Sequence, residues 1–407
     1  MTRLSMLCAV ALVCAGCDSD RTTDAGRADA AAPDAAVPDA AAVDAGMDDA
    51  GRADAAVDPD GGADDVRTAD ARTVGCWSID RVAFSSATAI DLALTADGSP
   101  RLGVIAEEAA WIVEPAGAGR WRTTRVGAVD SRFYAWITLG IDGEGRSHLL
   151  YSFGLSEDGA QLGVVYATDA SGAFVLREID EVTSGGAAHR IEGAVAFTEG
   201  GTVRFVAGTN RDNGTRFDVF AELVDIDAFA VGTPLVTVES LPFGSLNGLR
   251  VALRPGDGTW ATVAIRGSVY LTPAREGAVA ETVRDGSAGK PSLAFDASGE
   301  PWVAFGDSHG TVSKDQLVVA HREGDAWVEE IAVPLDIDIA QTASVFDGSG
   351  ALHVVFGGLR HAARASDGTW SVSTIGPGDL PVLRRAAGPL HLAYFESGAI
   401  DIAQCAP

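Results

Sequence analysis

Apolar and polar residues alternate in short runs along most of this chain, and the runs come in pairs separated by a tight glycine turn. Seven such pairs lie between Leu92 and Phe395, the clearest being SLAFDASGEPWVAFGD (292–307) and ASVFDGSGALHVVFGG (343–358). Period-two alternation of Val, Ile, Leu and Phe is typical of β-strands. We therefore predict antiparallel strand pairs joined at turn glycines, which are Gly98, Gly145, Gly201, Gly258, Gly299, Gly350 and Gly388.

A third alternating run follows each pair, and in most units a fourth run opens on an aromatic residue. These residues are Trp121, Phe174, Trp327 and Trp370, with Phe229 as the candidate in the third unit and only Val279 in the fourth. Strand repeats with a period of roughly 40 to 50 residues indicate a propeller. The pattern predicts an all-β fold, a seven-bladed β-propeller of four-stranded antiparallel blades. The recurrence of the aromatic residue favours packing between blades over ligand stacking.

The last unit ends at Pro407 without a fourth run, whereas residues 75–82 form an unpartnered run before the first unit. This run contains Trp77 and has the form of a fourth strand. We predict that it closes the ring by pairing with the strand that ends near Gln404, because closure removes two exposed sheet edges. Cys76 and Cys405 lie at that junction. We therefore predict a disulfide between them, since exported proteins meet an oxidising compartment.

The first residues have the features of an export signal. Arg3 precedes a short apolar stretch over residues 4–13, which is too short to span a bilayer. Cys14-Ala15-Gly16-Cys17 follows and resembles the bacterial lipobox, with Cys14 where that pattern prefers Leu. The resemblance implies a lipoprotein signal peptide over residues 1–17 and lipidation of Cys17. The expected location is the bacterial cell envelope, lipid-anchored on the periplasmic or outer surface, and the alternative is plain secretion if the lipobox is not used.

Residues 18–72 are rich in Asp, Ala and Pro. They hold fifteen Asp and five Arg, a net charge of −10, and offer little bulky apolar surface. Such a composition predicts a disordered tether, so we expect the propeller domain to span residues 73–407. The whole chain carries a formal charge of −27, which argues against nucleic-acid binding because that function needs clustered cations.

The repeats resemble those of secreted bacterial sialidase-like, BNR-type propellers. The resemblance rests on the Asp-x-x-Gly turns at Asp142, Asp296 and Asp347 and on the aromatic that opens the fourth strand. Sialidases use three arginines for the substrate carboxylate, a Tyr nucleophile backed by Glu, and an Asp acid. Several blades here contain Arg, but no Tyr–Glu pair falls on matching positions. The resemblance therefore predicts the fold more strongly than an activity.

Candidate ligand-binding residues lie where inner strands begin and where second strands end, because function usually resides on loops held by a rigid scaffold. The foremost are Trp136, Arg190, Arg211, Arg266, Asp307 and His309, with Glu107, Arg216, Lys314, Gln341 and Glu396 on the same predicted face. His148, His353 and His391 share one repeat position in separate blades, so a structural role is favoured over a metal site. No cofactor is expected.

The sequence favours a monomeric binding module for an envelope protein or glycan, attached to the membrane through its lipid. The alternative is a sialidase-like glycoside hydrolase or lyase with an active site on the loop face, and a third possibility is an architectural scaffold. Two carboxylates about 5 to 10 Å apart over the channel would favour the enzyme. An aromatic or mixed rim without such a pair would favour binding.

Overall fold

The computed structural model describes residues 65–406 apart from 69, 118, 130–134, 155–161, 180–188, 213–216, 226–229, 242–245, 256–257, 266, 276–277, 287, 309–314, 338, 340 and 386–387. The chain divides into two compact units, Met1–Val57 and Asp58–Pro407, and every described strand belongs to the second. Within this described part, no helix is long and apolar enough to cross a membrane.

The described strands pair into seven antiparallel sheets. The first sheet contains β4 (Ala87–Leu94), β5 (Pro100–Ala106), β6 (Ala109–Gly117), β7 (Arg120–Ala128) and β1 (Asp65–Thr68). The second contains β8 (Ala135–Ile141), β9 (Ser147–Gly154), β10 (Leu162–Thr168) and β11 (Val175–Ile179). The third contains β12 (His189–Glu199), β13 (Thr202–Asp212), β14 (Phe217–Asp225) and β15 (Ala230–Leu241).

The remaining four sheets follow the same order. They are β16 (Leu246–Arg254), β17 (Gly258–Ile265), β18 (Ser268–Pro273) and β19 (Glu281–Arg284); then β20 (Ala288–Phe295), β21 (Pro301–Ser308), β22 (Asp315–Glu323) and β23 (Ala326–Ile337); then β24 (Thr342–Phe346), β25 (Leu352–Phe356), β26 (Arg360–Arg364) and β27 (Trp370–Thr374). The last contains β28 (Asp379–Arg385), β29 (Leu390–Glu396), β30 (Ala399–Cys405), β3 (Trp77–Val82) and β2 (Asp70–Val74).

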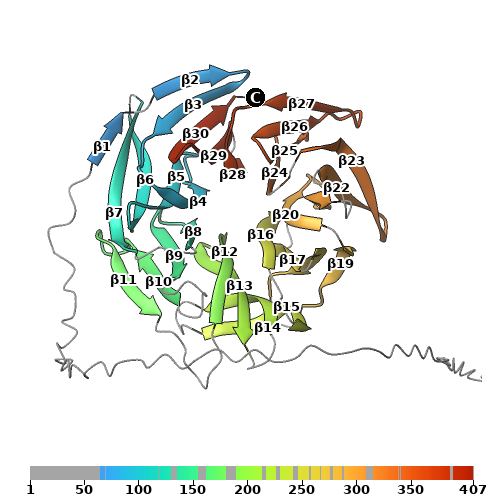
Figure 1. The fold of residues 1–407 in the computed structure, drawn as a ribbon, viewed down its shortest axis with the longest axis horizontal. Coiled ribbons are helices and arrows are strands. Elements are labelled where there is room, and N and C mark those ends of the chain that lie inside the picture. Colours follow the sequence, from blue (N-terminus) through green and yellow to red (C-terminus); the bar gives the residue numbers. More distant parts are fainter. Residues whose placement is uncertain are drawn as a thin grey trace, which may run out of the picture. The chain divides into compact units, whose positions relative to one another are not determined.

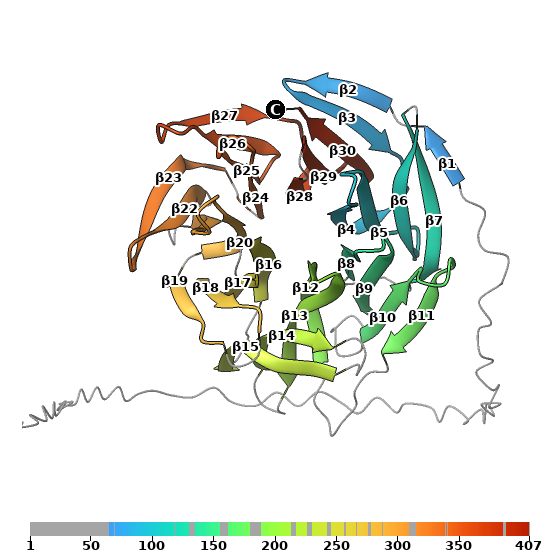
Figure 2. The ribbon, with the colours of Figure 1, turned by 180° about the vertical axis from the view of Figure 1, so that it is seen from behind.

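The strands nearest a common axis are β4, β8, β12, β16, β20, β24 and β28, one from each sheet (Figures 1 and 2). The sheets stand around that axis as blades. Along the chain, each of these inner strands contacts the next, and β28 contacts β4 to complete the circle. The predicted all-β propeller with four-stranded antiparallel blades is confirmed. Two sheets exceed the predicted four strands, because β1 adds to β7 and β2 adds to β3.

The core lies between neighbouring blades, and the aromatics that open the fourth strands belong to it. Trp121 is 4% exposed and packs in one cluster with Val82 and Ile400 of the adjoining blade. Its indole nitrogen donates to Asp80 Oδ2 at 3.3 Å, and the Trp370 nitrogen donates to Glu330 Oε2 of the preceding blade at 3.2 Å. These tryptophans therefore join blades, as their recurrence predicts.

Packing between blades is not confirmed for the candidates in the third and fourth units, Phe229 and Val279. The fourth strand of the β16 blade begins at Glu281, and Val279 lies before it, 86% exposed. Phe229 lies outside the described residues, so the start of β15 at Ala230 gives no test of its role.

The Asp-x-x-Gly turns are closed by their own carboxylates. Asp347 Oδ1 accepts the amide hydrogens of Ser349 and Ala351 at 2.8 and 2.9 Å, and Gly350 has a φ of +86°, which glycine adopts without strain. Burial alone would raise the pKa of Asp347, but hydrogen bonds from Ser349, His353 and Ala351 hold it well below its usual range. The turn that defines the repeat is therefore a structural unit.

The predicted ring closure is confirmed. β3 pairs with β30 in antiparallel register, with Trp77 opposite Cys405 and Ser78 opposite Gln404. The Cys76–Cys405 disulfide is also present, joining Cα atoms 5.0 Å apart. Cys76 follows Gly75 in the two-residue turn between β2 and β3, where Gly75 takes a φ of +59°. The disulfide thus links both ends of the propeller sequence at its outer rim.

Strands begin at Asp65, eight residues before the expected start of the propeller at residue 73. Arg72 explains part of this order. Its Nη2 donates to Asp401 Oδ2 at 2.9 Å and to the Tyr394 hydroxyl at 3.2 Å, and it also pairs with Glu396. Arg81 holds the same buried Asp401 through Nε at 2.7 Å. The last residues of the stretch that composition assigns to the tether are therefore fastened to the closing blade.

Candidate functional site

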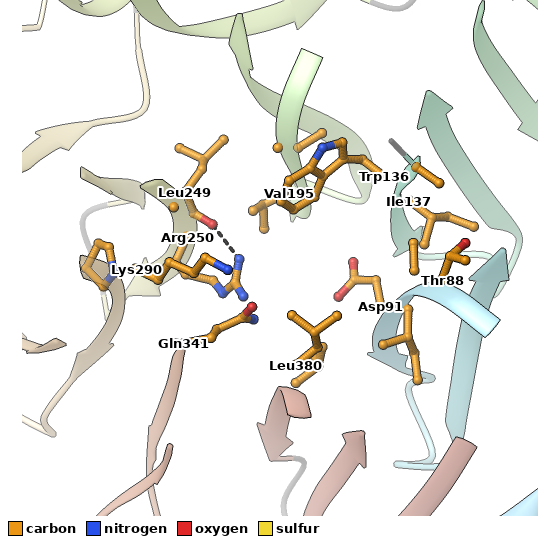
Figure 3. Close-up of a pocket in the computed structure, with 18 of the residues that line it drawn as sticks. Thr88, Asp91, Trp136, Ile137, Val195, Leu249, Arg250, Lys290, Gln341 and Leu380 are labelled. Atoms are coloured by element: carbon orange, nitrogen blue, oxygen red, sulfur yellow. Dashed lines mark hydrogen bonds between the residues drawn. The ribbon is translucent and has the colours of Figure 1, made fainter. Parts of the chain in front are cut away.

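A cavity of ≈ 280 Å³ lies where the inner strands begin, at one mouth of the central channel (Figure 3). Six of the seven sheets contribute residues to its wall, and Gln341, directly before β24 of the remaining sheet, completes it. Small and aliphatic residues form most of this wall, and the polar and aromatic groups are Thr88, Asp91, Trp136, Arg250, Lys290, Gln341 and Arg384. Figure 3 shows Arg250, Lys290 and Gln341 reaching in from one side while Asp91 faces them from the other. A second cavity of ≈ 680 Å³ lies towards the opposite ends of these strands.

Asp91 fastens three blades together at the channel wall. It is 8% exposed on β4, and its Oδ2 accepts the Thr138 hydroxyl at 3.0 Å and the Leu139 amide at 2.9 Å, both from β8. Its Oδ1 accepts the Leu92 amide at 2.9 Å and Arg384 Nη2 at 3.3 Å, the latter from β28. A carboxylate has about four acceptor positions. Those of Asp91 are therefore occupied by the scaffold.

Further hydrogen bonds continue this fastening around the channel. Thr138 Oγ1 accepts the Ala196 amide of β12 at 2.8 Å. On the other side, Gln341 Nε2 donates to the Pro381 carbonyl at 3.4 Å, and Thr342 Oγ1 donates to the Lys290 carbonyl at 2.9 Å. Consecutive inner strands from β20 through β24, β28, β4 and β8 to β12 are thus joined by side-chain hydrogen bonds, which makes the mouth a rigid frame.

Arg250 on β16 differs from these bridging groups. Its Nη1 donates to the carbonyl of its own neighbour Leu249 at 2.7 Å. Burial, followed by the charge of Arg384, lowers the pKa of Arg250 to about 10, and the charge of Asp91 partly opposes this shift. Gly248 lets β16 approach β20 closely, because a Cβ there would lie 2.8 Å from the Lys290 Cα. The chain therefore brings Arg250 and Lys290 to one wall of the cavity.

Some of the predicted ligand-face residues line the cavity, whereas others make contacts within the blades. Trp136 is 38% exposed and lines the cavity, as does Gln341. Asp307 is 1% exposed and pairs with Arg284 Nη2 at 3.3 Å, so it serves the blade rather than an open face. Glu396 is buried and pairs with Arg72 and Arg81, and Glu107 Oε1 accepts the Ser85 amide at 2.9 Å.

The side chains of the other predicted ligand-face residues are not among those that the structure describes. Arg190 and Arg211 lie on the paired strands β12 and β13, but their side chains are outside the description. Arg216, Arg266, His309 and Lys314 lie outside the described residues altogether.

Sequence reasoning missed Asp91, Arg250, Lys290 and Arg384, because they lie within inner strands rather than on loops. A signal was present in the repeat. Trp136, Lys290 and Gln341 each lie nine residues before the turn glycine of their unit, and Asp91 and Thr138 each lie seven residues before theirs. Polar residues that recur within inner strands indicate a wall that faces a cavity rather than the core.

The repeated histidines serve the turns. His148 Nε2 lies 3.1 Å from Asp142 Oδ2, and His353 Nε2 lies 3.2 Å from Asp347 Oδ2. In both cases the histidine lies six residues after the turn aspartate. His391 is 2% exposed, and burial lowers its pKa. Over the described ranges, no three His, Cys, Asp or Glu residues gather as a metal site would require.

The sequence matches no protein-family model, and no curated protein is similar enough to match it. Solved structures do resemble the fold. A catalytically inactive virginiamycin B lyase from Staphylococcus aureus with quinupristin is 11% identical with a TM-score of 0.51, covering 81% of this chain and 99% of the lyase. YCF48 bound to D1 peptide is 11% identical with a TM-score of 0.50, covering 84% of this chain and 98% of YCF48.

A sialidase resembles the chain less closely. The NanB sialidase from Streptococcus pneumoniae is 9% identical with a TM-score of 0.45, covering 79% of this chain and 68% of the sialidase. The similarity of the lyase and YCF48 structures shows a shared fold, and at 11% identity it shows the fold alone. A propeller fold hosts both enzymes and binding modules.

Proposed function

We propose that this protein is a binding module of the bacterial cell envelope, a monomeric seven-bladed propeller that receives a protein or glycan at the channel mouth lined by Trp136. One observation carries the proposal. The described wall of the cavity combines an exposed indole and three cations with a single carboxylate, Asp91. This is the mixed, partly apolar composition of a recognition site.

The alternative, a sialidase-like hydrolase or a lyase, needs a different set of groups. Glycoside hydrolysis generally uses two carboxylates, and the described cavity wall has one. Asp91 is held by β8 and Arg384, so it cannot approach a substrate without breaking the frame. Tyr151 and Tyr394 are 2% and 0% exposed, so neither phenol can act as a nucleophile towards a ligand in the cavity. These features favour binding over catalysis.

Trp136 should provide the contact surface. An indole at the rim presents a large flat apolar face that stacks on sugar rings or on peptide side chains. Its strand β8 is tied to β4 and β12 through Thr138, so the ring is carried on a rigid element. Little ordering of the frame is needed when a ligand binds, which favours affinity.

The test uses the full chain with Cys17→Ser, so that the protein stays soluble. A glycan array and a library of envelope peptides should each be probed with this protein and with an added Trp136→Ala. We expect the strongest ligand to lose about tenfold or more in affinity, as for a buried aromatic anchor. Ile331→Ala is the matched control, because Ile331 is 61% exposed on the outer strand β23. Equal losses in both variants would contradict the proposed site.

We also propose that Cys17 is lipidated and that the propeller is thereby attached to the membrane. The support is the apolar run that ends at Ala15-Gly16-Cys17, followed directly by the Asp-rich segment. Acyl chains add about 0.8 kcal/mol per buried CH₂, so several chains on one residue anchor stably. After detergent-free lysis, the wild-type protein should sediment with membranes and the Cys17→Ser variant should be in the soluble fraction. Sedimentation of both would refute the anchor.

A further inference from the structure

We propose that the channel mouth is an oxyanion site, in which Arg250, Lys290 and Arg384 receive a carboxylate or phosphate group of the ligand. This inference rests on the proposed binding function and specifies the chemistry that the ligand must carry. It concerns the cations of the wall and not Trp136, so the two ideas can be tested separately.

The charge of the cavity is the first argument. Three cations and one carboxylate line its described wall, in a protein whose formal charge is −27. A cationic cavity in a strongly acidic protein concentrates field lines at the mouth and attracts anions there. Nothing in the acidic surroundings requires these cations for solubility.

The hydrogen-bond donors of Arg384 and Arg250 are only partly used within the described part of the protein. Arg384 donates to Asp91 at 3.3 Å and to the Leu383 carbonyl at 3.1 Å. Arg250 makes one hydrogen bond with a described residue, to Leu249 O. A guanidinium has five N–H donors in a planar fork. Most of those on Arg250 therefore remain available to a ligand in the cavity.

The environment of Arg250 is the third argument. Its pKa falls to about 10 because burial and the nearby charge of Arg384 disfavour the cation. The scaffold offers it Asp91 as a partly compensating charge, but Asp91 is already held by Thr138, Leu139 and Arg384. A buried cation is stabilised by a hydrogen-bonded anion. A bound oxyanion between Arg250 and Lys290 supplies that partner.

The site differs from the arginine triad that the sialidase resemblance implies. Two of its cations are arginines and the third is a lysine, and no Tyr or Glu lines the described wall. Gly248 brings the backbones of β16 and β20 together, which positions this particular pair of side chains. The site therefore suits the binding of the charged end of a ligand and not the cleavage of a bond.

The experiment measures thermal unfolding and calorimetric binding of the full chain carrying Cys17→Ser. Inorganic phosphate and acetate are titrated separately at constant ionic strength, with chloride as the balancing anion. We expect a saturable rise in Tm with at least one oxyanion, since a ligand that binds the folded state stabilises it. The phosphate and acetate arms show which oxyanion the site prefers.

Arg250→Met should weaken that binding by about tenfold or more, because charge-assisted hydrogen bonds are lost. Arg250→Lys should restore part of it, and this variant keeps the test valid if the Met variant folds poorly. Arg120→Met is the control, because Arg120 is exposed on the outer strand β7. Equal responses of the Arg250 and Arg120 variants, or a Tm rise that chloride reproduces, would overturn the proposal. Loss of the oxyanion effect with Trp136-dependent binding intact would leave the proposed function standing.

Discussion

Replacing Cys76 and Cys405 by serine should lower the free energy of unfolding by several kcal/mol, up to the entropic value of about 6 kcal/mol for a disulfide that closes a loop of this length. The two cysteines are 329 residues apart in sequence, so nearly the whole propeller lies inside the loop. Without the bond, the unfolded chain gains the freedom of two independent ends. The folded ring keeps its β3–β30 pairing, and the loss therefore comes mainly from the unfolded state.

The measurement is chemical denaturation of the Cys17→Ser protein with and without the two further serines. A single Cys76→Ser should have nearly the same effect as the double change, because either one removes the bond. Reduction of the unsubstituted protein should reproduce the shift. Coincident unfolding midpoints, or alkylation of both thiols in the native non-reduced protein, would show that the disulfide does not form.

The closure could be predicted because the repeat leaves a visible gap. The last unit lacks a fourth run, and residues 75–82 supply an unpartnered one with the same aromatic, so local pattern and topology agree. The cysteines then fall at the only place where the repeating turn is interrupted. The contact between the two ends of the domain could therefore be predicted by comparing the repeat units with one another, although no single segment indicates it.

The start of the domain could not be predicted in the same way. β1 and most of β2 lie within the Asp-rich stretch of residues 18–72, and their order depends on partners further along the chain. Arg72 is the clearest case, since the carboxylates that hold it, Glu396 and Asp401, are more than 300 residues further on. Composition describes a segment alone, whereas a strand at a sheet edge is stabilised by its neighbour.

The candidate site shows a related difficulty. Function was sought on loops, whereas the polar wall of the channel comes from inner strands. Trp136 was predicted because it lies where an inner strand begins, but Arg250 lies inside β16, where alternation alone assigns it no special role. Its position depends on the close approach of β16 and β20 at Gly248, which no single-sequence pattern reveals.

A pair of histidines beside the closing blade gives the second large effect, a loss of stability in mild acid. His353 and His361 lie on the paired strands β25 and β26, with His353 Nδ1 2.8 Å from His361 Nε2 and the rings nearly parallel. His353 Nε2 also lies 3.2 Å from Asp347. If that nitrogen donates to the carboxylate, the neutral Nδ1 accepts from His361, and Asp347, His353 and His361 form one chain of hydrogen bonds.

A proton added to His361 is costly because the ring is buried, 8% exposed, and packed edge-on against Trp77. Burial, followed by the charge of His353, lowers the pKa of His361 to about 4. An unfolded chain titrates His near about 6.5. Above that pH neither state holds the proton and stability is complete. As pH falls towards 4, the unfolded state binds the proton first, so stability falls across this interval.

The difference between about 6.5 and 4 corresponds to a maximal loss of about 3 to 4 kcal/mol, at about 1.4 kcal/mol per pH unit. Urea unfolding from about pH 8 down to about pH 4.5 should show the decline as a falling midpoint with an unchanged slope. His361→Gln keeps a donor towards His353 but does not titrate, so its stability curve should be flatter over the same interval. His391, also buried with a lowered pKa, contributes a background common to both proteins. A constant stability difference between wild type and His361→Gln at every pH would show that the pair does not control the acid response.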